Sequence, residues 1–475
     1  MGILGAIMVP HPPIIMSEVG KGEERKIQQT INAYRAAAEF VQSLSPETIV
    51  ISSPHQVLYA DYFNIADGEG AKGSMARFGA GDVTFDVKYD RELIHRICRL
   101  CDISGLPAGT AGQRDPSLDH GAMVPLYFLR RVCPDVKIVR IGLSGLPTKK
   151  HYALGAFIRQ AAEEIDRRVV YIASGDLSHK LKEDGPYGFD SSGPVYDKKI
   201  MDVMGRAAFG ELFDFSEHLC NKAAECGHRS FVMMAGALSG LSVEPKALSH
   251  EDVFGVGYGI CTYRVTGTDR SRDFLTYADT AHSKRMDRIL SGEDIYIRLA
   301  RKAVNAYVNS RQKLSPDDIA DIAPEGLPAD MLGKRAGAFV SLHKNGNLRG
   351  CIGTICATED NIALEIITNA CSACSADPRF YPVRPDELDE LEISVDILGD
   401  AERIASASEL DVKRYGVIVT KGRRRGLLLP DLDGVDTPAQ QIAIAKQKAG
   451  IPAEDDDITL ERFEVIRHKA ADGDE

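Results

Sequence analysis

The chain has no tryptophan, no apolar run long enough to span a bilayer and no excess of positive charge. Its 57 lysines and arginines against 69 aspartates and glutamates give a formal net charge of −12 at pH 7. An acidic chain is poorly suited to nucleic acid or an anionic membrane surface, so we expect neither as a main partner. The apolar N-terminus lacks a basic start and a small-residue cleavage site, which favours a buried strand over a signal peptide.

The ten cysteines also lack the close spacing of a small disulfide-linked scaffold. Reduced thiols are the default in such a chain, so we expect a cytoplasmic protein. Two C-x-x-C pairs, Cys98/Cys101 and Cys371/Cys374, lie in segments with helical spacing. A structural zinc site needs four ligands with its own loop geometry. We therefore interpret both pairs as small buried residues.

The length of 475 residues exceeds the size at which one hydrophobic core keeps growing, so we expect two domains. In residues 1–266, strand-like runs alternate with amphipathic helical runs. This pattern predicts an α/β domain with a central sheet flanked by helices. Residues 267–289 are polar without clear periodicity and are predicted to be a linker. Residues 290–470 predict a smaller α+β domain.

Three short apolar runs each end just before a histidine. In an open α/β sheet, ligands bind outside the carboxyl ends of the strands. Three imidazole side chains at that edge predict a metal centre with a neighbouring acid–base residue. The runs and their histidines are Ile3–Val9 with His11, Thr48–Ser52 with His55, and Val169–Ala173 with His179.

Two neutral imidazoles and one carboxylate are typical of non-haem Fe(II) centres that bind substrate and oxygen together. We assign His11 and His55 as the nitrogen ligands and Glu225 as the candidate oxygen ligand. His179 suits general acid–base work because an unperturbed imidazole titrates at about pH 6.5. His120 could orient oxygen or a phenolic oxygen of the substrate. Taken singly, each of these residues is more often structural than functional. The hypothesis depends on their joint placement after strands.

Residues 1 to about 265 resemble the catalytic subunit of class III extradiol dioxygenases, the LigB-like superfamily. The resemblance rests on His-Pro-Pro, Ser-Pro-His, Asp-His-Gly-x-x-x-Pro-Leu and Ser-Gly-Asp-Leu-Ser-His. It implies an Fe(II)-dependent oxidoreductase that opens the ring of a catechol-like small molecule with O2. By this resemblance His11 and His55 hold iron, His179 is the acid–base residue and His120 stabilises oxygen-derived intermediates.

The superfamily includes the Memo branch, in which a cysteine followed by glycine replaces the glutamate. Cys226-Gly227 resembles that branch and Glu225 directly precedes it, so the sequence leaves both residues open as the third ligand. A carboxylate favours Fe(II), whereas a thiolate suits copper, zinc or an altered iron site. The histidine motifs follow the dioxygenase pattern and favour Glu225. The alternatives are a Memo-type metal-binding adaptor without ring cleavage and a hydrolytic metal site.

Residues of about 290–470 resemble the AMMECR-type domain, through Leu-Arg-Gly-Cys-Ile-Gly, Asp-Pro-Arg-Phe with the following Tyr-Pro-Val, and Tyr-Gly at 415–416. This resemblance implies a fold more than a mechanism. Arg349 could bind a carboxylate or phosphate, and Cys351 could be a nucleophile if a positive neighbour lowered its pKa. The structural alternative is a buried cysteine with Arg349 paired to an acidic side chain.

The fusion of these two domains resembles the AmmeMemoRadiSam grouping, whose third member is a radical SAM protein. The chain has no C-x-x-x-C-x-x-C triplet, so such an iron–sulfur partner would be a separate polypeptide. We expect a small aromatic diol and O2 as ligands. A radical SAM protein and a second copy of the chain in a homo-oligomer are further candidate partners.

Overall fold

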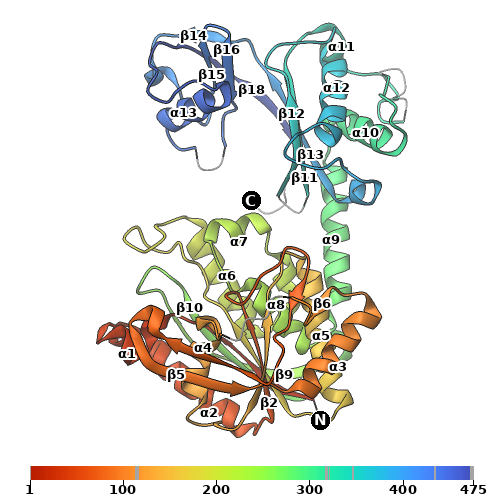
Figure 1. Cartoon of the computed structure of the whole chain (residues 1–475). Coiled ribbons are helices and arrows are strands. Elements are labelled where there is room, and N and C mark those ends of the chain that lie inside the picture. Colours follow the sequence, from red (N-terminus) through yellow and green to blue (C-terminus); the bar gives the residue numbers. More distant parts are fainter. Residues whose placement is uncertain are drawn as a thin grey trace. The chain divides into compact units, whose positions relative to one another are not determined.

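The computed structural model describes residues 2–112, 117–315, 319, 321–344, 347–432 and 435–470. The chain divides into two compact units, Met1–His282 and Ser283–Glu475 (Figure 1). Each unit has its own core of buried apolar side chains. The first unit has α/β architecture and the second combines antiparallel sheets with helices, so both predicted fold classes are confirmed.

The first unit is built on a six-stranded sheet with the order β7-β2-β8-β1-β10-β9. Neighbouring strands from β7 to β1 pair in parallel, and β10 and β9 extend this sheet as an antiparallel edge. The strands are β1 (Ile3–Val9), β2 (Thr48–Ser53), β7 (Lys137–Gly142), β8 (Val169–Ser174), β9 (Leu241–Glu251) and β10 (Tyr258–Thr268).

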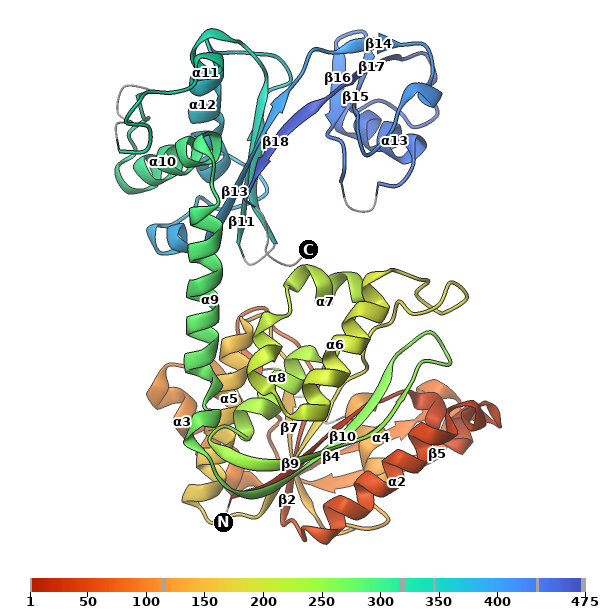
Figure 2. The same cartoon turned by 180° about the vertical axis from the view of Figure 1, so that it is seen from behind.

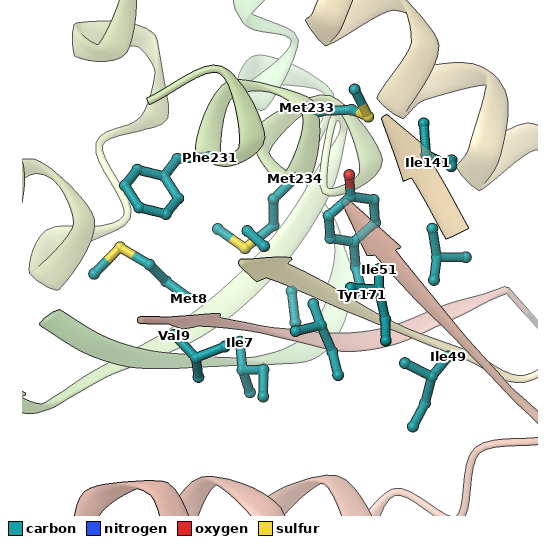
Figure 3. Close-up of a cluster of buried hydrophobic side chains, with 14 of the residues drawn as sticks. Ile7, Met8, Val9, Ile49, Ile51, Ile141, Tyr171, Phe231, Met233 and Met234 are labelled. Carbon is teal, nitrogen blue, oxygen red and sulfur yellow. The ribbon is translucent and has the colours of Figure 1, made fainter. Parts of the chain in front are cut away.

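Helices cover both faces of this sheet, which is why its central strands are apolar throughout. Every residue of β2 and β8 is buried. Figures 1 and 2 show α2 and α8 on opposite sides of the strands. Figure 3 shows Met8 and Tyr171 of the sheet near Phe231 and Met234 of α8. Helices that pack on the sheet include α2 (Gln28–Ser43), α4 (His120–Leu129), α5 (Thr148–Glu164) and α8 (His228–Ala237).

Two glycines allow α5 and α8 to pack with their backbones in contact. A Cβ on Gly155 of α5 would lie 1.9 Å from the carbonyl oxygen of Met233. A Cβ on Gly236 of α8 would lie 2.0 Å from the carbonyl oxygen of Tyr152. Both distances are far inside van der Waals contact, so neither position accepts a side chain without separating the helices.

The parallel strands end level with one another. Val9 at the end of β1 pairs with Ser174, and Ser52 near the end of β2 pairs with Ala173. The segments that follow β1, β2 and β8 therefore leave the sheet at the same edge. These are the segments that carry the three histidines singled out by the sequence.

Further elements of the first unit surround this sheet. The antiparallel pair β4–β5 was not predicted. Its first strand is polar and rich in glycine, although Val83, Phe85 and Val87 of the second strand alternate with polar residues. The elements are α1 (Ser17–Gly20), β3 (Phe63–Asn64), β4 (Gly70–Met75), β5 (Ala80–Lys88), α3 (Arg91–Ser104), β6 (Ala108–Gly109), α6 (Ser192–Arg206) and α7 (Glu217–Ala223).

The segment predicted as a polar linker is largely a helix, α9 (Phe274–Ser291). In the first unit, the backbone N–H of Phe274 donates to the hydroxyl of Tyr152 at 3.0 Å. In the second unit, Arg285 pairs with Glu392 at 2.9 Å. Few of its side chains are buried, which explains why the sequence shows no clear helical periodicity.

The second unit contains two four-stranded antiparallel sheets, with orders β12-β11-β13-β18 and β14-β17-β15-β16. Helices α10 and α12 pack on the first sheet and α13 packs on the second. Its strands are β11 (Ala338–Lys344), β12 (Asn347–Gly353), β13 (Leu391–Leu398), β14 (Glu402–Ile404), β15 (Gly416–Lys421), β16 (Arg424–Leu428), β17 (Thr459–Phe463) and β18 (Val465–Lys469). Its helices are α10 (Ile295–Ser310), α11 (Ala329–Gly333), α12 (Ile362–Ser375) and α13 (Pro438–Ala449).

Neither C-x-x-C pair forms a disulfide. Cys98 and Cys101 lie in α3, and Cys371 and Cys374 lie in α12, all as free thiols. Burial raises the pKa of Cys98 to about 11 and that of Cys374 to about 12. Within the described residues, no helix combines the length and apolar character that a bilayer-spanning segment requires.

Candidate metal centre

Three side chains from distant parts of the first unit converge at the carboxyl edge of the sheet. The Nε2 atoms of His11 and His55 lie 2.9 Å apart, and Cys226 Sγ lies 3.6 Å from Nε2 of His11. The three potential ligand atoms all lie within 4.8 Å of one another. The structure thus brings together both predicted imidazole ligands and one of the two candidates for the third ligand.

The surroundings of His11 prepare its Nε2 atom to bind a cation. The hydroxyl of Ser174 donates to the carbonyl of Gly121 at 2.6 Å, so its oxygen accepts from Nδ1–H of His11 at 3.0 Å. This assignment leaves the lone pair of Nε2 facing the cluster. Burial, followed by the nearby imidazoles of His55 and His179, lowers the pKa of His11 and keeps the ring neutral.

The loop that carries His55 is tied to the start of α4. The backbone N–H of His55 donates to Ser53 Oγ at 3.2 Å, and the Ser53 hydroxyl donates to Asp119 Oδ1 at 2.5 Å. Asp119 also caps α4 by accepting from the backbone N–H of Ala122. His120 begins this helix and stacks on His55 with ring centroids 3.9 Å apart. Burial, then the rings of His55 and His11, lower the pKa of His120 to about 4.

A pair of glycines brings Cys226 to the histidines. A Cβ on Gly175 would lie 2.1 Å from the Cα atom of Gly227, so the loop after β8 and the loop before α8 touch through their backbones. The backbone N–H of Asp176 donates to Cys226 Sγ at 3.3 Å across this contact. Sequence reasoning missed this glycine pair, although each glycine is adjacent to a residue of the site.

The thiol of Cys226 lies in surroundings that oppose its ionisation. Burial raises the pKa of this thiol, and the carboxylates of Asp176 and Glu225 raise it further. A bound metal cation reverses this electrostatic balance because a coordinating thiol is deprotonated. The site therefore suits Cys226 as a thiolate only when a cation is present.

Glu225 does not belong to the cluster found among the described residues. Its Oε2 atom accepts a hydrogen bond from the backbone N–H of His228 at 2.5 Å, at the first residue of α8. Burial raises the pKa of this carboxyl to about 7. The geometry therefore favours Cys226 over Glu225 as the candidate third ligand, because the Glu225 carboxylate is hydrogen-bonded at the start of the helix.

His179 lies at the same edge with one nitrogen held and one directed towards a carboxylate. Its Nδ1–H donates to the carbonyl of Ala224, which leaves the lone pair on Nε2. That Nε2 lies 3.9 Å from Asp176 Oδ2, and Nε2 of His11 lies 4.0 Å from the same oxygen. Asp176 thus stands between the cluster and His179. The sequence interpretation gave it no catalytic role, although it lies inside the Ser-Gly-Asp-Leu-Ser-His motif.

The donor set fits a transition metal. Ligand atoms about 2.0–2.3 Å from one ion lie roughly 3–4 Å apart. The two distances from Nε2 of His11, 2.9 Å to His55 and 3.6 Å to Cys226, agree with this range. Two neutral imidazoles and a thiol are accepted by iron, copper or zinc, and the thiol favours the softer ions. His11, His55 and Cys226 are therefore the residues that would hold the metal.

Of the two residues singled out in the C-terminal half, Arg349 already has its partners. Its Nε and Nη2 atoms donate to the two oxygens of Glu387 at 3.0 and 2.9 Å. Its Nη1 donates to the carbonyl of Tyr381 at 2.9 Å. The structural alternative, in which Arg349 is paired with an acidic side chain, is therefore the one observed. Cys351 is half-buried on β12.

Comparison with known proteins agrees with this architecture. Residues 5–261 match the family described as the catalytic LigB subunit of aromatic ring-opening dioxygenase, and residues 297–468 match AMMECR1. Protein CA_C1420 of Clostridium acetobutylicum is 39% identical over 476 residues, which cover 99% of this chain and 100% of that protein.

Shorter relatives match part of the chain. A protein of Thermotoga maritima is 52% identical over 179 residues, or 38% of this chain and 99% of its own length. The crystal structure of the uncharacterized protein PH0010 from Pyrococcus horikoshii is similar at 29% identity, with a TM-score of 0.34, over 37% of this chain and 90% of that one. The fold is that of a two-domain protein whose first domain carries a candidate His-His-Cys metal site. The chain belongs to the LigB family and carries a C-terminal AMMECR1 domain.

Proposed function

We propose that the N-terminal domain is a metal-dependent oxidoreductase of the extradiol-dioxygenase type, acting with O2 on a catechol-like small molecule. The observation that carries this proposal is the convergence of His11, His55 and Cys226, with His179 and His120 at the same edge of the sheet. Membership of the LigB family supports the same reaction class. Fe(II) is the proposed metal, and copper or zinc is the alternative because a thiolate is a soft ligand.

The residues around the cluster would each have a separate role in the reaction of a dihydroxylated substrate. A bound metal would supply Lewis-acid polarisation of the two substrate oxygens. His179 would accept a substrate hydroxyl proton at Nε2, because Nδ1 is committed to the carbonyl of Ala224. Asp176, 3.9 Å from that nitrogen, would stabilise the resulting imidazolium. His120, held neutral by burial, would offer an uncharged hydrogen-bonding group beside the rings of His55 and His11.

The test uses the full chain purified without oxygen, loaded with Fe(II), and mixed with a panel of catechols and O2. A coloured ring-opened product is expected, and His179→Ala should abolish it while metal content is retained. The matched control is His95→Ala, which alters an exposed histidine on α3. Full metal occupancy without product from any diol would contradict ring cleavage.

A second candidate function rests on Cys226 standing where the dioxygenase pattern has a carboxylate. A thiolate-containing site without ring cleavage would suit a metal-binding adaptor that works with a separate radical SAM protein. Capture of such a protein by the metal-loaded chain, together with stoichiometric metal and no diol turnover, would support the adaptor. Turnover of a catechol that depends on His179 would exclude it as the main function.

A further inference from the structure

A second cluster of reactive groups lies in the C-terminal unit, around Cys351 of β12. Arg379 follows α12 in the chain, and Lys448 lies near the end of α13. These elements belong to the two different sheets and their helices. The grouping therefore depends on the tertiary fold of the domain, and the proposed metal centre uses none of its members.

Asp377 fixes the positions of both Cys351 and Arg379. Its Oδ2 accepts the backbone N–H of Cys351 at 2.8 Å and Nη2 of Arg379 at 2.7 Å. Its Oδ1 accepts Nε of Arg379 at 2.9 Å. Arg379 Nη2 also donates to the carbonyl of Cys351 at 3.2 Å. A buried carboxylate that holds both residues makes their relative placement specific.

The thiol itself is in contact with donors and positive charge. The hydroxyl of Ser341 donates to Cys351 Sγ at 3.2 Å, and the Arg379 guanidinium interacts with the same thiol. Lys448 interacts electrostatically with both Cys351 and Arg379. Partial desolvation of its ammonium group lowers the pKa of Lys448, and the Arg379 charge lowers it further. Asp377 thus holds the Arg379 guanidinium beside the half-buried Cys351, and the ammonium of the exposed Lys448 adds a second positive charge in the neighbourhood.

The neighbouring segment is open to solvent and held in place. Tyr381, two residues beyond Arg379, is 92% exposed, and Arg349 binds its backbone carbonyl. Arg349 therefore acts as a positioning residue for this segment. Reactive cysteines occupy partly exposed, electropositive surroundings, whereas buried structural cysteines are inert. Cys351 has the first kind of surroundings, whereas Cys101, Cys371 and Cys374 are buried.

We propose that Cys351, Arg379 and Lys448 form a second site for a small electrophile that carries a carboxylate. The two cations bind the carboxylate, and the Cys351 sulfur attacks a carbon of the electrophile, so that a carbon–sulfur bond forms while the bond to a leaving group breaks and that group departs with the electron pair. This site is independent of the function proposed for the N-terminal domain. Asp377 is its positioning residue, because it holds Arg379 and the backbone of Cys351 together.

The probe for this site is iodoacetate, with the neutral iodoacetamide as its matched control. In both reactions a carbon–sulfur bond forms, the carbon–iodine bond breaks and iodide leaves with the electron pair. The thiol proton passes to the buffer. The two reagents differ in the carboxylate, so the ratio of their rates at one cysteine reports the local preference for an anion.

The experiment alkylates the full chain with each reagent and measures the rate at each cysteine by mass spectrometry. We expect the iodoacetate-to-iodoacetamide ratio at Cys351 to exceed that of free β-mercaptoethanol by about tenfold. Raising the salt concentration should lower this excess. The exposed Cys356 provides an internal comparison. A Cys351 ratio equal to that of the free thiol would overturn the proposal.

Two substitutions test the cations separately. Arg379→Gln and Lys448→Gln should each lower the ratio at Cys351 about threefold or more and leave the ratio at Cys356 unchanged. If both variants fold and neither changes the ratio at Cys351, the cations do not form the site and the proposal is wrong. If a variant fails to fold, the wild-type ratio and its salt dependence still decide the outcome.

Discussion

Cys226 and Cys351 are each followed within two residues by a glycine, but their surroundings differ in charge. Cys226 lies among neutral imidazoles and the carboxylates of Asp176 and Glu225, and these carboxylates and burial raise its pKa. Cys351 is half-buried beside Arg379 and Lys448. At the first thiol, a cation must come from outside the chain. At the second, the fold supplies cations of its own, although one of them, Arg379, is paired with the carboxylate of Asp377. One residue type can therefore serve as a metal ligand or as a nucleophile, depending on where the positive charge originates.

The largest expected effect is a difference in alkylation rate between these two thiols in the metal-free protein. Iodoacetamide should alkylate Cys351 at least about 100-fold faster than Cys226, because desolvation and the nearby carboxylates of Asp176 and Glu225 raise the pKa of Cys226 and disfavour its thiolate. Peptide mass spectrometry after timed quenching measures both rates in one sample. Equal rates would show that the two surroundings do not differ as described.

The backbone contact that places Cys226 can be broken with one methyl group. Gly175→Ala would place a Cβ 2.1 Å from Gly227 Cα, so we expect a loss of about 1–3 kcal/mol in the free energy of unfolding and weaker metal binding. Chemical denaturation and metal titration measure the two effects. Gly205→Ala is the control, because its Cβ would have no heavy atom closer than 3.7 Å. If Gly175→Ala behaved like that control, the glycine contact would not shape the site.

Arg349 offers a smaller test on the C-terminal side. Arg349→Lys removes the two-pronged pairing with the largely buried Glu387 and should lower the free energy of unfolding by about 1–2 kcal/mol. Arg384→Lys, in a solvent-exposed pair with Asp386, should cause no measurable change in the same denaturation experiment. If Arg349→Lys left the free energy of unfolding unchanged, the pairing with Glu387 would not be structural. Arg349 would then again be a candidate ligand-binding residue.

The smallest expected effect concerns His250, away from both thiols. Its Nε2 lies 2.7 Å from Asp197, and this hydrogen bond raises the pKa of His250 above its ordinary value. The hydrogen bond therefore stabilises the folded state fully below the pKa that His250 has in the unfolded chain. This stabilisation is lost as the pH rises through the pKa of His250 in the folded protein. An NMR titration should give a raised pKa that falls in Asp197→Asn. If the pKa of His250 is unchanged in Asp197→Asn, Asp197 is not the cause of the raised pKa.

Much of the metal site follows from local sequence. Apolar runs that end before His11, His55 and His179 indicate buried strands, and parallel pairing then brings their ends to one edge. The third ligand could not be decided in this way. Glu225 and Cys226 are neighbours in the chain, and only the long-range contact between Gly175 and Gly227 brings the thiol to the histidines.

The same limit applies to the second unit. The sequence marked Arg349 and Cys351 but left open what surrounds each of them. Glu387, Arg379 and Lys448 come from segments far along the chain, and their contacts depend on the packing of two sheets. The bounds of the polar helix α9 could not be predicted for a different reason, because a helix that buries few of its described side chains has no strong apolar face to reveal it.

The most direct test of the account is the metal content of three purified proteins: wild type, Cys226→Ser and Glu225→Gln. Elemental analysis after reconstitution with Fe(II), and separately with copper, should give one ion per chain in the wild type and in Glu225→Gln. It should give far less in Cys226→Ser. Retention of the ion in Cys226→Ser with its loss in Glu225→Gln would contradict the assignment of Cys226 as the third ligand.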